Sequence, residues 1–147
     1  MHTKPQLNPG GSQTVRLWIV EDNYADALLI DMALERTGLN LEKTLMHDGE
    51  SAIGAIRACQ AGTIPRPDIM LLDLSLPKFD GVDVLRALRE TPLFDDVGIA
   101  VFSSSPAITA SLGVRRFLQK PSRLEQFLEQ VGRTVMELVP GGTIPES

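Results

Sequence analysis

Acidic and hydroxyl side chains follow three apolar runs of the chain, at points where buried strands are expected to end. Glu21 and Asp22 come directly after the run VRLWIV, and Asp73 lies near the end of the run IMLLDL. Ser103 lies near the end of a third run, VGIAVFSS. In an open parallel sheet, ligands bind at the carboxyl ends of the strands, near the switch in strand order. We therefore expect these four side chains to meet in one cleft.

The chemistry that such a cleft supports is phosphoryl transfer to a carboxylate. Converging carboxylates repel each other unless a cation joins them. Oxygen ligands with no His or Cys nearby favour Mg²⁺ over zinc. An Asp beside Mg²⁺ can act as a nucleophile and form an acyl phosphate, and we assign this part to Asp73. Lys120, just before Pro121, is placed to neutralise charge on the transferring group together with the metal.

Simpler interpretations stand beside these assignments. Asp22 or Asn23 could cap the first helix, Ser103 could be a turn residue, and Lys120 could be a solvated strand end. Asp73 has no comparable simple interpretation, because an unpaired buried carboxylate is costly. The metal-site interpretation is favoured because these features occur together in one chain.

The elements that must position these residues alternate between strands and helices. Apolar runs predict strands over 15–20, 41–47, 69–74, 97–104 and 115–119. Helical spacing predicts helices over 24–38, 48–62 and 81–90, and a last helix that starts with a capping box of Ser122 and Glu125 and ends at Pro140. This alternation predicts an α/β fold, a doubly wound five-stranded parallel sheet covered on both faces.

Composition bounds the class of protein. The chain has 147 residues and a formal net charge of -5, which argues against nucleic-acid binding. It has one cysteine, Cys59, and no leader-like or membrane-length apolar run. His47 and Cys59 lie in no ligand-spaced cluster, and we expect both to be structural. We predict a cytoplasmic protein with no membrane contact, made of a flexible arm (1–14), one domain (15–139) and a flexible tail (140–147).

Four segments of the chain resemble the signature blocks of response-regulator receiver domains. The segments are VEDN (20–23), LLDLSLPKFDG (71–81), VFSSS (101–105) and FLQKPS (117–122). The resemblance covers about 15–139. The opening block, the PRPD lead-in (65–68) and LPKFDG look most like small single-domain regulators that accompany phytochrome-type kinases. The resemblance implies the flavodoxin-like receiver fold.

The resemblance also implies a role for individual residues. The metal ligands correspond to Glu21, Asp22, Asp73 and the backbone carbonyl of Ser75. Asp73 corresponds to the phosphoacceptor and Lys120 to the phosphate-binding lysine. Ser103 and Phe117 correspond to the switch hydroxyl and the switch aromatic, although plain core packing is an equally good interpretation of Phe117.

The function implied is that of a single-domain response regulator. Asp73 would accept a phosphoryl group from a sensor histidine kinase or a phosphotransfer protein, with Mg²⁺, and a downstream protein partner would read the change. The chain would not be an enzyme beyond slowly losing its own phosphoryl group. A phosphohydrolase is disfavoured because Ser75 stands where a second acid is usual. Homodimer formation stays open.

One departure from the family pattern supports an alternative. Sixteen residues separate Ser103 from Lys120, about five fewer than is usual in the family. The missing length falls in the fourth helix, which we therefore expect to be shortened. A shortened fourth helix leaves open a receiver-fold interaction module that does not switch by phosphorylation.

Overall fold

A parallel five-stranded sheet forms the centre of the protein, in the order β2-β1-β3-β4-β5. The computed structural model describes residues 14–74, 81–103, 117–119 and 123–140. Its strands are β1 (Val15–Val20), β2 (Leu41–Met46), β3 (Ile69–Asp73), β4 (Gly98–Ser103) and β5 (Phe117–Gln119). Chain order and strand order differ, so the direction of winding reverses after β2, as expected for a doubly wound sheet.

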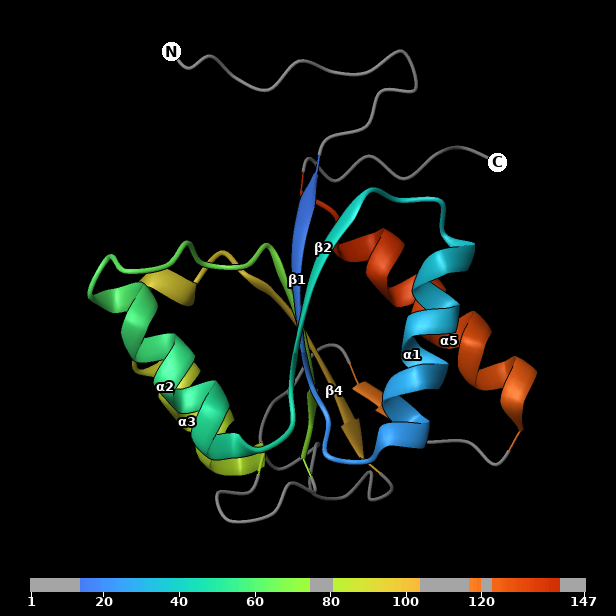
Figure 1. Cartoon of the computed structure of the whole chain (residues 1–147), viewed down its shortest axis with the longest axis horizontal. Coiled ribbons are helices and arrows are strands. Elements are labelled where there is room, and N and C mark those ends of the chain that lie inside the picture. The colour runs from blue at the N-terminus through green and yellow to red at the C-terminus, as the bar shows by residue number, and fades with distance from the viewer. Residues whose placement is uncertain (1–13, 75–80, 104–116, 120–122, 141–147) are drawn as a thin grey trace.

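Helices cover both faces of this sheet. They are α1 (Tyr24–Arg36), α2 (Gly49–Gln60), α3 (Gly81–Arg89) and α5 (Leu124–Leu138), with a short 3₁₀ turn η1 at Pro92–Phe94. Figure 1 shows α2 and α3 on one side of the strands and α1 and α5 on the other. No helix in the described part of the chain has the length and apolar character needed to cross a bilayer.

The continuous apolar runs become interior strands because both faces of the sheet are covered. Along β1, Trp18 and Val20 pack in the core beside α2 and α3, whereas Leu17 and Ile19 pack in the core beside α1 and α5. All five residues of β3 are buried. The edge strand β2 has a mixed pattern, with only Met46 fully buried. The predicted α/β fold and the covering of both sheet faces are therefore confirmed.

Helix boundaries follow the expected signals with one correction. Gly38, the predicted stop of α1, has φ +74°, a conformation that glycine adopts without steric cost. The capping box predicted for α5 is wrong: the N-cap is Arg123 and makes no side-chain capping bond. Glu125, its second predicted member, pairs with Arg36 of α1 at 3.1 Å, while Ser122 lies outside the described residues. The fourth-helix region (104–116) also lies outside them.

Candidate functional site: an acidic cluster at the carboxyl edge of the sheet

The pairing of β1 with β3 brings two of the acids together. Val20 is in register with Leu72, so Glu21 and Asp73 are the next residues on two neighbouring strands. Side chains alternate between faces along a strand, so Glu21 follows Ile19, and Asp73 follows Leu71, toward the face of α1 and α5. Both acids are 1% exposed.

Asp22 completes the cluster. Glu21, Asp22 and Asp73 each offer a carboxylate oxygen, and these oxygens all lie within 4.8 Å of one another. Asp22 is exposed, so the cluster has two buried members and one that faces solvent. Two unit charges 4.8 Å apart repel by about 3 kcal/mol at an effective dielectric constant of about 20. The donor set, which is oxygen only and lies within one small volume, fits a hard divalent cation such as Mg²⁺.

The neighbouring Asn23 resolves an ambiguity of the sequence. Asn23 is the N-cap of α1, and its Oδ1 accepts the Asp26 backbone N–H at 2.9 Å. The Asn23 backbone N–H in turn donates to Glu21 Oε2 at 3.2 Å. Asn23 therefore does the capping, so the simpler interpretation of Asp22 as the cap is wrong and Asp22 lies in the acidic cluster.

The remaining predicted site residues are placed less completely. Ser103 is the last residue of β4 and is 4% exposed. Its predecessor Phe102 is in register with Asp73, so Ser103 lies one step beyond the aspartate on the adjacent strand. Phe117 begins β5, and its side chain lies outside the described part of the protein, as do Ser75 and Lys120.

Gly81 contributes to the site in a way that the sequence analysis did not identify. Its backbone N–H donates to the Leu74 carbonyl at 3.0 Å, which closes the chain back onto the end of β3. A Cβ at this position would lie 2.2 Å from the Leu74 Cα and 2.5 Å from the Asp73 carbonyl oxygen. Only glycine fits here, so Gly81 fixes the backbone next to Asp73. The signal available in the sequence was the glycine that ends LPKFDG.

A ring pair at the carboxyl end of β2 was also not predicted. Tyr24, the first residue of α1, and His47, which follows β2, have ring centroids 4.8 Å apart. Tyr24 is 73% exposed, and His47 is exposed as well. Because the Glu21 backbone N–H donates to the Met46 carbonyl at 2.9 Å, this pair lies near the acidic cluster. His47 thus packs against an exposed ring instead of in the core.

The fold and the cluster together define a class: an α/β domain of flavodoxin-like topology with an acidic, cation-type site at the carboxyl edge of its sheet. Residues 17–132 match the response regulator receiver domain. The chain belongs to this family, whose members are the receiver domains of two-component signalling.

Similar proteins include regulators of differing length. The chain is 33% identical over 125 residues to the probable methanogenesis regulatory protein FilR2 of Methanothrix harundinacea, a match that covers 82% of this chain and 78% of FilR2. The chain is 31% identical to the response regulator MprA of Mycobacterium bovis, and this match covers 80% of this chain but only 49% of MprA. The chain thus spans about half the length of some of its relatives.

Two solved structures share both the fold and part of the sequence. The phosphorylated cyanobacterial phytochrome response regulator RcpA superposes with a TM-score of 0.78 at 29% identity, over 91% of this chain and 100% of that one. The Mn²⁺-bound form of the response regulator Rcp1 superposes with a TM-score of 0.76 at 26% identity, over 90% and 99%. The predicted resemblance to phytochrome response regulators is therefore confirmed.

Proposed function

We propose that this protein is a phosphorylated response regulator in which Asp73 accepts a phosphoryl group in the presence of Mg²⁺. The observation that carries the proposal is the cluster of Glu21, Asp22 and Asp73, whose carboxylate oxygens lie within 4.8 Å of one another. Two acids would hold the cation while the third also serves as nucleophile. The Mn²⁺-bound Rcp1 structure supports a divalent cation in a similar domain.

The proposed reaction is an in-line displacement at phosphorus. A carboxylate oxygen of Asp73 forms the new P–O bond, and the P–N bond of a phosphohistidine in the donor breaks, which returns the electron pair to the imidazole. Bound Mg²⁺ would offset the negative charge of the acids and of the phosphoryl oxygens. Glu21, Asp22, Asp73 and the Ser75 carbonyl would hold it. Lys120 would pair with the phosphoryl oxygens. Ser103 would be the switch hydroxyl that closes onto the phosphoryl group, and Phe117 would be the switch aromatic.

The proposed donor is a sensor histidine kinase or a phosphotransfer protein, and we favour a phytochrome-type kinase. The likeness to the phytochrome response regulator RcpA supports this choice. Such a donor draws its phosphoryl group from ATP, so the proposal places the reaction in the cytoplasm. The product would act through contact with a downstream protein, and the domain would be no enzyme beyond the slow loss of its own phosphoryl group.

Intact-mass measurement tests the proposal. Wild type, Asp73→Ala and the matched control Asp96→Ala, which removes an exposed acid after η1, are incubated with a small phosphodonor and Mg²⁺. We expect one added phosphoryl group on wild type and on Asp96→Ala, none on Asp73→Ala, and none on any of them with a chelator. Equal labelling of Asp73→Ala and wild type would refute the assignment. No labelling of wild type would favour the non-switching interaction module.

Lys120 is tested separately, because its proposed part is electrostatic. Lys120→Ala should still be phosphorylated to some extent, while the spectral change on adding a beryllofluoride phosphate mimic should be weaker than in wild type. A full wild-type response in Lys120→Ala would remove the lysine from the proposed mechanism.

A further inference from the structure

The strand β2 forms one lateral edge of the sheet. It stands at the end of the strand order and pairs with β1 alone, and within the described ranges no other strand pairs with it. Figure 1 shows β2 in front of the sheet, between α2 on one side and α1 on the other. An edge strand presents a row of backbone hydrogen-bonding groups to any chain that can pair with them.

The two ends of the β1–β2 ladder show which backbone groups face outward. The Val15 N–H donates to the Asn40 carbonyl and the Glu21 N–H donates to the Met46 carbonyl, both at 2.9 Å. In a parallel pair, every second residue of a strand bonds to its partner, so the even-numbered residues of β2 face β1. The backbone groups that point away from the sheet belong to Leu41, Lys43 and Leu45.

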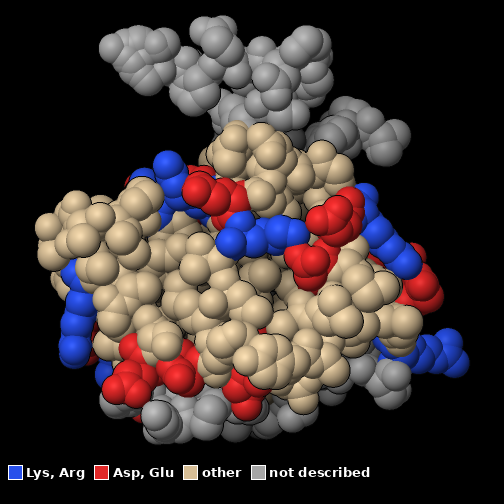
Figure 2. Space-filling model, viewed as in Figure 1, with Lys and Arg blue, Asp and Glu red and all other residues tan. Residues whose placement is uncertain are grey.

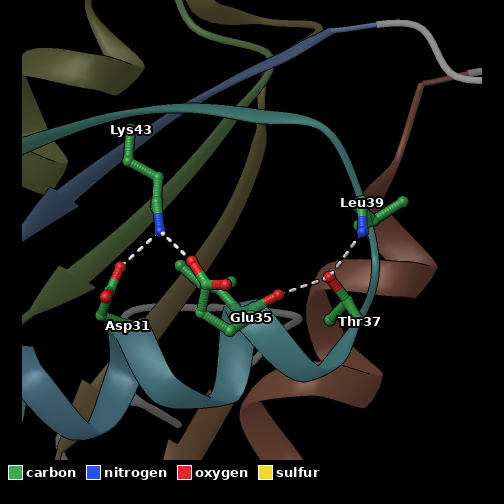
Figure 3. Close-up of polar contacts among 6 residues, drawn as sticks. Asp31, Glu35, Thr37, Leu39 and Lys43 are labelled. Carbon is green, nitrogen blue, oxygen red and sulfur yellow. Dashed lines mark hydrogen bonds and ion pairs between the residues drawn. The ribbon is translucent and has the colours of Figure 1, made fainter.

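Lys43 does not shield this edge as an edge lysine commonly does. Its ammonium group is held by two acids of α1, Asp31 at 2.5 Å and Glu35 at 3.3 Å. Figure 3 shows the side chain directed from β2 toward these carboxylates. The Lys43 side chain is 26% exposed. Its charge is paired across the α1 face, so Lys43 leaves the outer edge of β2 unshielded within the described part of the chain.

A cavity of about 380 Å³ lies beside the same edge, on the face opposite to Lys43. Trp18 of β1, Thr44 and Met46 of β2, Ala55 of α2 and the 38%-exposed Ile64 line it. The lining is mostly apolar. In Figure 2, which looks onto this edge, a basic side chain with acidic neighbours crosses the upper middle of the face, and uncharged residues lie below it and to its left.

The lining of the cavity includes two oppositely charged residues that pair with each other. Arg16 Nε lies 3.3 Å from Glu42 Oε1, and both residues line the cavity. The cavity therefore offers apolar surface with no unbalanced charge. A side chain that enters it should itself be uncharged and apolar.

We propose that the β2 edge and this cavity together form a docking site for an extended peptide segment of a protein partner. The segment would add a strand to β2 through the backbone groups of Leu41, Lys43 and Leu45, and would insert one apolar side chain into the cavity. This combination of main-chain bonds for affinity and a side-chain pocket for selectivity is a general mode of peptide recognition. On the α1 face, the neighbouring residue of the peptide would meet Leu45, which is 40% exposed.

A partner segment suits this edge better than a second copy of the chain. A two-fold antiparallel pair of β2 strands centred on Lys43 places the two Lys43 residues directly opposite each other, and one centred on Glu42 does the same for glutamate. A pair centred on Thr44 opposes no like charges, but the side chains it brings to the cavity face are Glu42, Thr44 and Met46, and the charged glutamate does not suit the apolar lining. Like charges in directly opposed positions destabilise a strand pair. A peptide with uncharged residues at these positions meets no such repulsion.

The probe is a panel of seven-residue peptides, acetyl-Lys-Thr-X-Thr-X-Thr-Lys-amide, in which both X residues are Phe, Leu or Val. Their alternation gives one apolar and one hydroxyl-bearing face in an extended conformation. Trp18, the single tryptophan, lines the cavity and reports binding by its fluorescence. Amide hydrogen exchange gives the second readout: the outward amides of Leu41, Lys43 and Leu45 should exchange more slowly with peptide bound, by about tenfold if each gains one hydrogen bond.

Two variants and their matched controls separate the edge from the cavity. Leu45→Pro removes an outward N–H that the ladder does not use, which an edge strand tolerates, whereas Leu45→Val keeps that N–H. Ala55→Phe fills the cavity, whereas Phe at the preceding position, Gly54→Phe, projects into open space. We expect Leu45→Pro and Ala55→Phe each to weaken binding by about tenfold or more, and both controls to stay within about threefold.

Three results would overturn the proposal. The first is a panel in which no peptide changes Trp18 emission or β2 exchange at millimolar concentration. The second is binding that Leu45→Pro and Ala55→Phe leave unchanged although both variants are folded by circular dichroism. The third is a dimer in sedimentation that Leu45→Pro dissociates, because that would assign the edge to a second copy.

Discussion

Replacing Gly81 with alanine tests how the backbone next to Asp73 is held. The added Cβ would lie 2.2 Å from Leu74 Cα and 2.5 Å from the Asp73 carbonyl oxygen, far inside the roughly 3.5 Å of a favourable carbon–carbon contact. Because the atoms it meets belong to the backbone, no side chain can rotate away. The strand end and the start of α3 must separate, which breaks the Gly81–Leu74 hydrogen bond.

The expected cost is at the upper end for an overpacked site, about 3 kcal/mol in the free energy of unfolding. For a domain of this size that corresponds to a fall in Tm of about 6–12 °C. Phosphorylation of Asp73 should fall as well, because the nucleophile shares the displaced backbone. Thermal melting followed by circular dichroism, with intact-mass labelling in parallel, measures both effects.

Gly54→Ala is the matched control, and its expected effect has the opposite sign. Gly54 lies inside α2, and a Cβ there would meet nothing within 4 Å, so alanine should stabilise the helix by about 1 kcal/mol. Its Tm should rise by about 2–4 °C. A Gly81→Ala protein as stable and as readily labelled as wild type would show that β3 and α3 do not approach as closely as the structure indicates.

Three further predictions concern charged groups. The Arg36 guanidinium lowers the pKa of Glu125, mainly through their hydrogen bond and also through its charge. The pair therefore adds to the free energy of unfolding above pH 4.5, and this stabilisation is lost as the pH falls through the lowered pKa. Glu125→Gln should be slightly less stable than wild type at pH 7 and equal to it at pH 3, by urea unfolding; a difference that persists at pH 3 would contradict this. The hydrogen bond that the Lys43 ammonium donates to Asp31 raises the pKa of Lys43 above its usual 10.5, so the stability that this pair adds is present below that pH and is lost as the pH rises through the raised pKa. Lys43→Met should therefore lower Tm at pH 7 but not at pH 12. An unchanged Tm at pH 7 would show that the ion pairs of Lys43 with α1 do not stabilise the fold. Mg²⁺ at ten times its Kd should stabilise wild type by about 1.4 kcal/mol and Asp22→Asn by clearly less, in thermal melts with and without the ion; equal gains would place the cation elsewhere.

The sheet could be predicted from the sequence because its signals are local and periodic. β1 and β3 are apolar at every or nearly every position, which requires cover on both faces, and the structure buries them as expected. Gly38 ended the first helix for a steric reason that the residue type alone reveals. The start of α5 was mispredicted because the pattern of Ser122 and Glu125 was interpreted as local. A contact 89 positions away in sequence, with Arg36, engages Glu125 instead.

The acid cluster was predictable for a related reason. Residues at the ends of neighbouring parallel strands meet whatever the details of packing, so finding the strand ends sufficed for Glu21, Asp22 and Asp73. The distinction between Asp22 and Asn23 was not available, because it depends on which side chain reaches the Asp26 N–H. The close approach of Gly81 and the position of His47 beside Tyr24 are likewise products of tertiary packing.

The two sites, one proposed for phosphorylation and one for peptide docking, lie on different edges of one sheet. The acidic cluster is at the carboxyl ends of the strands, whereas the β2 edge runs along the side of the sheet, and no residue of the cluster lines the cavity. A direct link between them is the hydrogen bond from the Glu21 N–H to the carbonyl of Met46, a residue that also lines the cavity. A peptide on β2 would therefore leave the cluster accessible to a phosphodonor. The end of β2 is therefore a route by which one site could affect the other, and by linkage any such effect on binding must be equal in both directions.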